Sequence, residues 1–476
     1  MTDSFDHRDD AATMDAIEGM VTGRLSRQEF VKRASLLGFS MSAIGGMLAA
    51  AGRASGAGYS GLERYAGTTI SILIAAEGDE KGVQDKLGTI KKRYGIDVKV
   101  TALPVGPLLE KANQNLKAPT SSFDAIMVLG FSVSQMVGGG YFDVLNPRLK
   151  KVPPGYDFPG DFPPGELDYV GYYDVKRQRF GGKTLYLIPG LHGGSVVMYY
   201  RKDLFKSAGL QPPKTYAQYL AAAKKLNSGG VAGNSMIAKS GDVSMFLVDW
   251  YTRFINMGGK LMTGSPQAKN FTPHLTSTQG VAALQHMVDC VESASSGVHE
   301  YDFTASTDSF SAGKTALMLM WSTIGGPVYN PKSSKVAKTA GVAVPPGGGK
   351  AVRGGWGMGI PKNAKNKDAA WTVITYLTSK EWERYQTLKY QTDPTRNSTF
   401  FSPALNRALP YLSVAGQVFQ KAKILEIALV PETFEMITAA AEEFPAALTG
   451  SSSAADACKK ANDRWIQILK RGGHLK

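Results

Sequence analysis

The region from residue 69 to residue 129 alternates between strand patterns and helix patterns. Strand patterns occupy residues 69–74, 97–100 and 125–129, and helix patterns occupy residues 81–94 and 108–116. When strands and helices alternate in this way, successive strands pair in parallel and the helices cover the faces of the sheet. The alternation therefore predicts an α/β fold with a largely parallel sheet.

A second α/β region is expected to begin near residue 183. Proline, glycine, tyrosine and aspartate dominate residues 150–182, which indicates a loop or a crossing between domains. Thr215 followed by Gln218, and Thr378 followed by Glu381, are capping-box patterns that predict the starts of two helices. Further strands or helices are predicted at residues 195–200, 281–291, 315–320 and 454–470.

The composition excludes several classes of protein. The 476 residues are 43% hydrophobic and 20% charged, which fits a globular chain of two or three domains. The net charge is +14, but the lysines and arginines are scattered and form no arginine-rich tract, so we expect no nucleic-acid partner. The two cysteines and six histidines show no metal-site spacing, and neither a metal nor a cofactor is expected. Cys458 lies on the apolar face of the predicted last helix, where a free buried thiol is expected.

Residues 1–57 are predicted to be an export segment. A basic stretch, residues 24–33, precedes an apolar run over residues 34–51 that is too short and too rich in glycine to span a membrane well. The stretch Ser26–Lys32 resembles a twin-arginine export motif in which Gln28 replaces the second arginine. The sequence Leu48–Gly52 lacks the cysteine of a lipoprotein signal, so we expect a periplasmic, unlipidated product. A helix that is never removed is the alternative.

Four segments resemble a known family. Tyr199–Leu210, with Tyr-Tyr-Arg-Lys-Asp-Leu-Phe and Ala-Gly-Leu, is followed by Pro213-Lys214-Thr215-Tyr216. Phe310–Met318, Gly354–Lys362 and Asp393–Ser398 follow in the expected order. This arrangement resembles the family 1 extracellular solute-binding proteins of ABC importers, the maltose-binding-protein-like sugar binders, over about residues 68–470.

The resemblance implies a two-lobed periplasmic-binding-protein fold with a ligand cleft between the lobes. Chain order assigns residues 58–170 and 345–382 to lobe one, and residues 183–344 and 383–476 to lobe two, with 171–182 as a crossing. The family's function implies a monomer that binds a sugar or polyol, closes by hinge motion, and delivers its ligand to the permease subunits of an importer.

Candidate ligand-binding residues follow from the chemistry of sugars. Hydroxyl groups bind best to charged or amide groups, and the apolar face of a sugar ring packs on aromatic rings. Such residues should lie in loops after strands, facing the crevice. The candidates are Glu77, Asp79, Phe131, Ser132, His192, Gly193, Asp242, Trp321, Ser322, Gly355, Trp356, Asp393 and Arg396.

Several candidates have a purely structural alternative. Glu77 and Asp79 would equally suit a solvated turn, and Phe131 would suit the core. Trp321 and Trp356 are the favoured stacking platforms, whereas Trp250 fits the core better. Asp393 and Arg396 lie in the segment that resembles a sugar-binding loop, and an exposed Asp–Arg pair is their alternative.

The sequence argues against an enzyme. Ala312–Thr315 mimics the end of a phosphate-binding loop, but Asp308 stands where that motif needs glycine. There is no Gly-x-Ser-x-Gly elbow and no assembled nucleophile and base. Two alternatives remain open: the same fold binding another solute, such as a phosphorylated polyol, and an exported enzyme.

Overall fold

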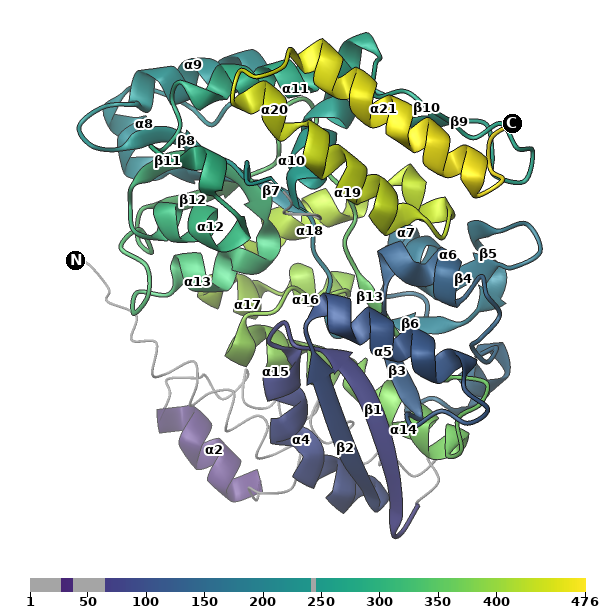
Figure 1. The fold of residues 1–476 in the computed structure, drawn as a ribbon. Coiled ribbons are helices and arrows are strands. Elements are labelled where there is room, and N and C mark those ends of the chain that lie inside the picture. The colour runs from purple at the N-terminus through teal and green to yellow at the C-terminus, as the bar shows by residue number, and fades with distance from the viewer. Residues whose placement is uncertain (1–26, 37–64, 241–244) are drawn as a thin grey trace.

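The computed structural model describes residues 27–36, 65–240 and 245–476, and these form two α/β lobes (Figure 1). Of the expected export segment, only α2 (Arg27–Leu36) lies in the described residues. The predicted ligand residue Asp242 lies outside them. Among the described residues, no helix is both long enough and apolar enough to cross a membrane.

The first lobe is built on a five-stranded sheet of order β2-β1-β3-β13-β6. Its strands are β1 (Thr68–Ala75), β2 (Ile96–Leu103), β3 (Ala125–Leu129), β6 (Leu187–Pro189) and β13 (Trp356–Gly359). β1 pairs in parallel with β2 and β3, whereas β13 is antiparallel to β3 and β6. The helices of this lobe are α4 (Asp79–Tyr94), α5 (Val105–Lys117), α6 (Val133–Met136) and α14 (Lys367–Leu377).

The second lobe is built on a four-stranded sheet of order β12-β7-β11-β8. Its strands are β7 (Val196–Arg201), β8 (Ala232–Ser235), β11 (Thr315–Trp321) and β12 (Ala340–Ala343). Every residue of β11 is buried, because helices cover both faces of this central strand. The helices of this lobe are α8 (Lys202–Ser207), α9 (Tyr216–Leu226), α10 (Met245–Asn256), α11 (Thr278–Val291), α12 (Phe303–Ser311), α13 (Gly325–Tyr329), α19 (Thr433–Glu443), α20 (Pro445–Leu448) and α21 (Ala454–Arg471).

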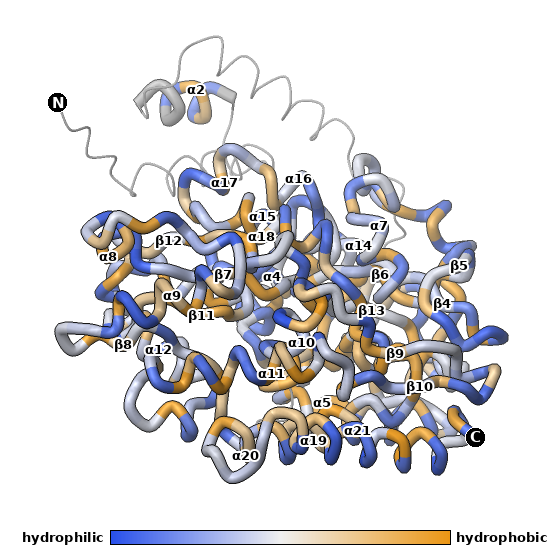
Figure 2. Tube along the Cα trace, turned by 90° about the horizontal axis from the view of Figure 1, so that it is seen from above, coloured by the Kyte–Doolittle hydropathy of each residue, from blue (hydrophilic) through white to orange (hydrophobic). Residues whose placement is uncertain are grey.

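The amphipathic helix α21 packs the C-terminal part of the chain against the second lobe. Hydrophobic and hydrophilic residues alternate along it in the view from above (Figure 2), and Cys458 and Trp465 lie on its buried side. It packs against α11 and α19. Cys458 and Cys290 are both buried and free, as the apolar setting of Cys458 predicted.

Further helices and strands lie between these elements. They are η1 (Gly130–Ser132), α7 (Pro164–Glu166), η3 (Leu167–Gly171), β4 (Tyr172–Asp174), β5 (Arg179–Leu185), β9 (Met262–Thr263), β10 (Thr272–Pro273), α15 (Lys380–Tyr390), α16 (Asn397–Phe400), α17 (Pro403–Ala408), α18 (Leu412–Lys421) and η6 (Glu426–Leu429).

Three segments pass side by side between the lobes. Ser195, after β6, forms a bridge with Arg353, which precedes β13. Val352 in turn forms a bridge with Lys423, after α18. These bridges bring the three segments into contact where the lobes meet.

The local sequence patterns predicted the elements well, with one error at a helix cap. Each strand and helix pattern between residues 69 and 129 lies within β1, β2, β3, α4 or α5. Thr215 caps α9, since its side chain accepts a hydrogen bond of 3.2 Å from the Gln218 amide. The second capping box was wrong by one residue, because Ser379 caps α15 and accepts from the Trp382 amide. Thr378 instead ends α14.

The lobe boundaries expected from chain order differ from the structure in three places. β6, expected in lobe two, pairs with β13 in the first sheet, because its apolar side chains Leu187 and Ile188 are buried there. The crossing at 171–182 contains β4 and most of β5, which form an antiparallel hairpin. α15, most of which was expected in lobe two, packs against α4 of lobe one.

Candidate functional site

The predicted ligand residues gather where the edges of the two sheets approach each other. In the first lobe, Glu77 follows β1, Phe131 follows β3 and His192 follows β6, all at the carboxyl ends of strands that run the same way. The antiparallel strand β13 begins at this edge with Trp356. In the second lobe, β11 ends at Trp321 and Ser322 follows, at the edge where β7 begins. Crevices at such strand ends are where α/β proteins bind their ligands.

Glu77, Asp79, His192, Gln386 and Asp393 form one group of polar side chains, which we call the His192 cluster. Asp79 is fully buried at the start of α4, and its Oδ2 lies 3.5 Å from Nδ1 of His192. Its other oxygen, Oδ1, accepts a hydrogen bond from the amide of Gln386. Gln386 lies on α15 and was not predicted from the sequence.

Asp393, which follows α15 in the chain, connects this cluster to the second lobe. The Ser322 hydroxyl donates a hydrogen bond to Oδ2 of Asp393, and the Ser195 amide donates to the Ser322 hydroxyl at 3.2 Å. The Gly193 amide donates to the backbone carbonyl of Asp393 at 3.1 Å. A side chain at Gly193 would place Cβ only 2.3 Å from the Pro394 carbonyl oxygen, so this close approach requires glycine.

The charges of the cluster act on one another. Burial lowers the pKa of His192, but its close contact with Asp79 and the charges of Asp79, Glu77 and Asp393 raise it to about 9. Burial raises the pKa of Asp393 to about 6, although Ser322 and His192 oppose that shift. Burial also raises the pKa of Asp79. Glu77 is exposed to solvent, yet the protein around its carboxyl group desolvates it and raises its pKa.

Both favoured tryptophans border the cluster. Trp356 is only 2% exposed, its amide donates to the His192 carbonyl at 3.1 Å, and its indole hydrogen-bonds Glu77. The Trp321 ring lies so close to Gly354 that a Cβ there would stand 2.6 Å from it. Their role as stacking platforms stays a prediction. Trp250 belongs to the core, as expected, because its ring stacks on Phe254 and its indole donates to the Gly280 carbonyl.

A second polar group lies beside the cluster, and we call it the Glu166 group: Phe131, Ser132, Glu166, Tyr169 and Arg353. Glu166 is fully buried, and its Oε2 lies 3.4 Å from Nη1 of Arg353. Burial raises the pKa of Glu166 to about 7, although Arg353 opposes the shift. The ring of Phe131 meets that of Tyr169 edge to face at 6.3 Å.

Gly355 connects the two groups and makes room for Glu166. A Cβ on Gly355 would lie 2.3 Å from Oε1 of Glu166, and the next residue along the strand is Trp356. The sequence pointed to Phe131, Ser132 and Gly355 but missed Glu166, Tyr169 and Arg353. Glu166 follows a Pro-Pro-Gly stretch that predicts only a loop, so no local signal marks it.

These two groups contain eight of the nineteen unpaired buried polar atoms found among the described residues. Folded proteins normally pair their buried polar atoms, so orphaned ones indicate where a water or a ligand binds. Those of the two groups that lack a hydrogen-bond partner within the protein are Asp79 Oδ2, Ser132 Oγ, Glu166 Oε1, Tyr169 OH, His192 Nδ1, Arg353 Nε, Gln386 Oε1 and Asp393 Oδ1. The arrangement can accept and donate hydrogen bonds to a polar molecule enclosed between the lobes.

A pocket of about 370 Å³ opens at the same junction. Gly165 and Asp168 line it from lobe one, Tyr251 lines it from lobe two, and Arg353 and Lys423 line it from the crossing segments. The Tyr251 hydroxyl donates to Glu426 at 3.0 Å across one side. In the described part of the chain, no group of three or more histidine, cysteine, aspartate or glutamate side chains is placed to hold a metal ion.

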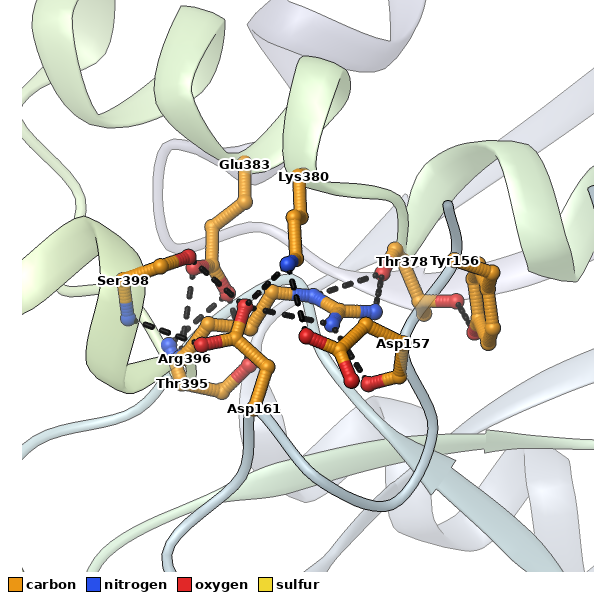
Figure 3. A network of polar contacts seen from close by, with 9 residues as sticks. All are labelled: Tyr156, Asp157, Asp161, Thr378, Lys380, Glu383, Thr395, Arg396 and Ser398. Carbon is orange, nitrogen blue, oxygen red and sulfur yellow. Dashed lines mark hydrogen bonds and ion pairs between the residues drawn. The ribbon is translucent and has the colours of Figure 1, made fainter. Parts of the chain in front are cut away.

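The structure places Arg396 in a separate, fully engaged network (Figure 3). Its guanidinium donates through Nε and Nη2 to the Thr378 carbonyl, at 3.2 and 2.8 Å, and lies 3.5 Å from Asp161. Arg396 is fully buried, so the exposed Asp–Arg pair considered above is wrong, and its carboxylate partner is Asp161 rather than Asp393. Glu383 completes the network by accepting from the backbone amides of Thr395 and Arg396.

Comparison with known proteins identifies the family. Residues 76–384, more than half of the chain, match the bacterial extracellular solute-binding protein family. The chain belongs to this family. It is 27% identical over 320 residues to a probable amino-acid ABC transporter periplasmic-binding protein of Sinorhizobium fredii, covering 66% of this chain and 70% of that protein. It is 26% identical over 318 residues to the mannitol-binding protein of Pseudomonas aeruginosa, covering 62% and 71%.

Solved structures of solute-binding proteins share the fold. A ribitol complex of an ABC transporter solute-binding protein from Agrobacterium radiobacter K84 aligns with a TM-score of 0.71 and 24% identity, over 85% of this chain and all of that one. The two-lobed α/β fold expected from the sequence is therefore confirmed.

Proposed function

We propose that this chain is the extracytoplasmic receptor of an ABC importer, and that it captures a sugar or polyol between its lobes and delivers it to the permease. The observation that carries the proposal is the set of unpaired buried polar atoms in the His192 cluster and the Glu166 group. A polyhydroxy ligand offers several hydroxyl groups that both donate and accept, which is what such a set requires.

The aromatic residues at the junction support the same ligand class. Trp321 and Trp356 border the cluster, and Phe131 borders the Glu166 group. Rings of this kind pack on the C–H faces of a sugar. Two of the similar proteins support a polyol, since one is a mannitol-binding protein and a structural neighbour holds ribitol, whereas a third is named as a probable amino-acid binding protein.

The three crossing segments support closure of the lobes. Domains joined by short segments close on a ligand by hinge motion, and an importer then recognises the closed form. The twin-arginine-like stretch around Gln28 supports export to the periplasm. We propose binding without chemical conversion, because the matched family and the structural neighbour are solute-binding proteins.

Thermal melting of the full chain against neutral sugars, polyols, sugar phosphates and amino acids tests the proposal. A ligand at a hundred times its Kd stabilises the folded state by about 2.7 kcal/mol, which raises Tm by several degrees. A shift with a neutral sugar or polyol, together with unchanged ligand recovered after incubation, supports the proposal. A shift with amino acids or sugar phosphates alone would contradict the ligand class, and a changed ligand would contradict pure binding.

A further inference from the structure

The His192 cluster holds more acidic groups than cations. Glu77, Asp79 and Asp393 supply three carboxyl groups, and His192 supplies one imidazole. Within the described residues, no lysine or arginine nitrogen lies within 4.0 Å of these carboxyl groups. Because Asp79 takes the imidazole as its partner at 3.5 Å, Glu77 and Asp393 have no cation of their own.

Two neighbouring carboxylates have cations close to them. In the neighbouring Glu166 group, the one carboxylate faces one guanidinium at 3.4 Å, so its charges balance. In the network of Figure 3, Asp161 faces both Lys380 and Arg396. Glu166 and Asp161 therefore each face a cation, whereas Glu77 and Asp393 in the cluster do not.

The unpaired atoms of the cluster also favour a positively charged partner. Oδ1 of Asp393 and Oε1 of Gln386 are hydrogen-bond acceptors without a donor in the protein, and both side chains are at most 1% exposed. Burying a carboxylate oxygen without a counter-charge costs free energy. A hydroxyl group of a ligand would give such an acceptor one hydrogen-bond donor but no positive charge. An ammonium group gives three donors and a positive charge.

We infer that the ligand carries a protonated amino group beside its hydroxyl groups, as in an amino sugar or amino polyol, and that this group binds at Asp393 and Glu77. The inference rests on the proposed function and specifies its ligand class. Trp356 lies at the same place, and an indole ring also attracts a cation. The hydroxyl groups of such a ligand would extend toward Glu166 and Arg353.

Matched ligand pairs test this in calorimetric titrations of the full chain at pH 7.5. The pairs are D-sorbitol with 1-amino-1-deoxy-D-sorbitol, and D-glucose with D-glucosamine, and N-acetyl-D-glucosamine is the control that keeps the nitrogen but removes its charge. We expect the amine of at least one pair to bind at least tenfold more tightly than its neutral partner, and acetylation to abolish the gain.

The Asp393→Asn variant tests the place of binding. It should bring the ratio of amine to neutral affinity close to one, whereas Asp85→Asn, on the exposed side of α4, should leave the ratio unchanged. A pH series of the same titrations on the unmodified chain tests the place of binding without a variant. For the sorbitol pair the ratio should fall between pH 7.5 and 5, because Asp393, with a pKa of about 6, gains a proton there while the amine of 1-amino-1-deoxy-D-sorbitol stays charged.

The other groups that face Asp393 keep their charge over this interval. The pKa of His192 is about 9, and burial raises the pKa values of Tyr199 and Tyr411 well above the usual value. If neutral polyols bind and the amines bind equally or more weakly, the inference is wrong and the proposed function stands. If no sugar, polyol or amine binds, the proposed function fails first and the inference falls with it.

Discussion

Replacing Arg396 by alanine should destabilise the fold strongly and leave the ligand site intact. The Arg396 guanidinium is fully buried, donates three hydrogen bonds to the carbonyls of Thr378 and Asp157, and faces Asp161 at 3.5 Å. It also lies 4.2 Å from the centre of the Phe162 ring. The substitution removes all of these contacts and leaves Asp161, itself 6% exposed, with Lys380 as its remaining cation.

Removing one partner of a buried ion pair costs about 3–5 kcal/mol. For a lobe that unfolds as a unit of 150–250 residues, that loss lowers Tm by about 6–20 °C. Arg148→Ala is the matched control, since Arg148 pairs with the largely exposed Asp368 and such pairs contribute at most about 1 kcal/mol. Urea unfolding followed by circular dichroism, and melting without ligand, measure both variants.

Ligand titration of the folded Arg396→Ala protein separates the two interpretations of this residue. We expect an affinity within about threefold of the parent, because the guanidinium has no free donor directed at the cluster. A variant that melts like the parent but loses its ligand would refute the reasoning and restore Arg396 to the binding site.

Three further predictions follow from the site and the core. His192 has a pKa of about 9, raised above its ordinary value of 6.5, so its pairing stabilises the fold below pH 6.5 and that contribution is lost as pH rises through 9. Urea titrations should show a fall of about 1–3 kcal/mol over this interval that is absent from His192→Gln. Gly355→Ala should weaken ligand binding at least tenfold, since its new methyl group collides with a carboxylate oxygen 2.3 Å away, whereas Gly106→Ala, with no atom within 4 Å, should bind normally. Both cysteine thiols are buried with pKa values of about 12, so a thiol reagent should label neither in the native protein and both in denaturant; fast native labelling would contradict the burial.

The sequence predicts the local elements because their signals are local. The alternation of residues 69–74 and the cap at Thr215 depend on neighbours a few positions away, and both are confirmed. The insertion of β13 between β3 and β6 could not be predicted, because it depends on pairing with segments far away in the chain. The error at Thr378 arose because the next residue, Ser379, is an equally good cap.

The same reasoning explains which members of the two polar groups the sequence indicated. Residues directly after strands, such as Asp79 and His192, follow from where the strands end. Gln386 and Glu166 were missed because their partners lie 307 and 187 positions away in the chain. The ion pair of Arg396 with Asp161 could not be predicted, because Asp161 lies 235 positions earlier in a stretch that predicts only a loop.

Calorimetric titration of the full chain with neutral sugars and polyols, beside the Asp393→Asn variant, tests the central claim most directly. The account predicts one ligand per chain and binding that is weakened at least tenfold in the variant while its Tm without ligand stays close to that of the parent. Saturable binding that is unchanged in Asp393→Asn would place the ligand elsewhere and contradict the site, and the absence of binding to every sugar and polyol would contradict the function.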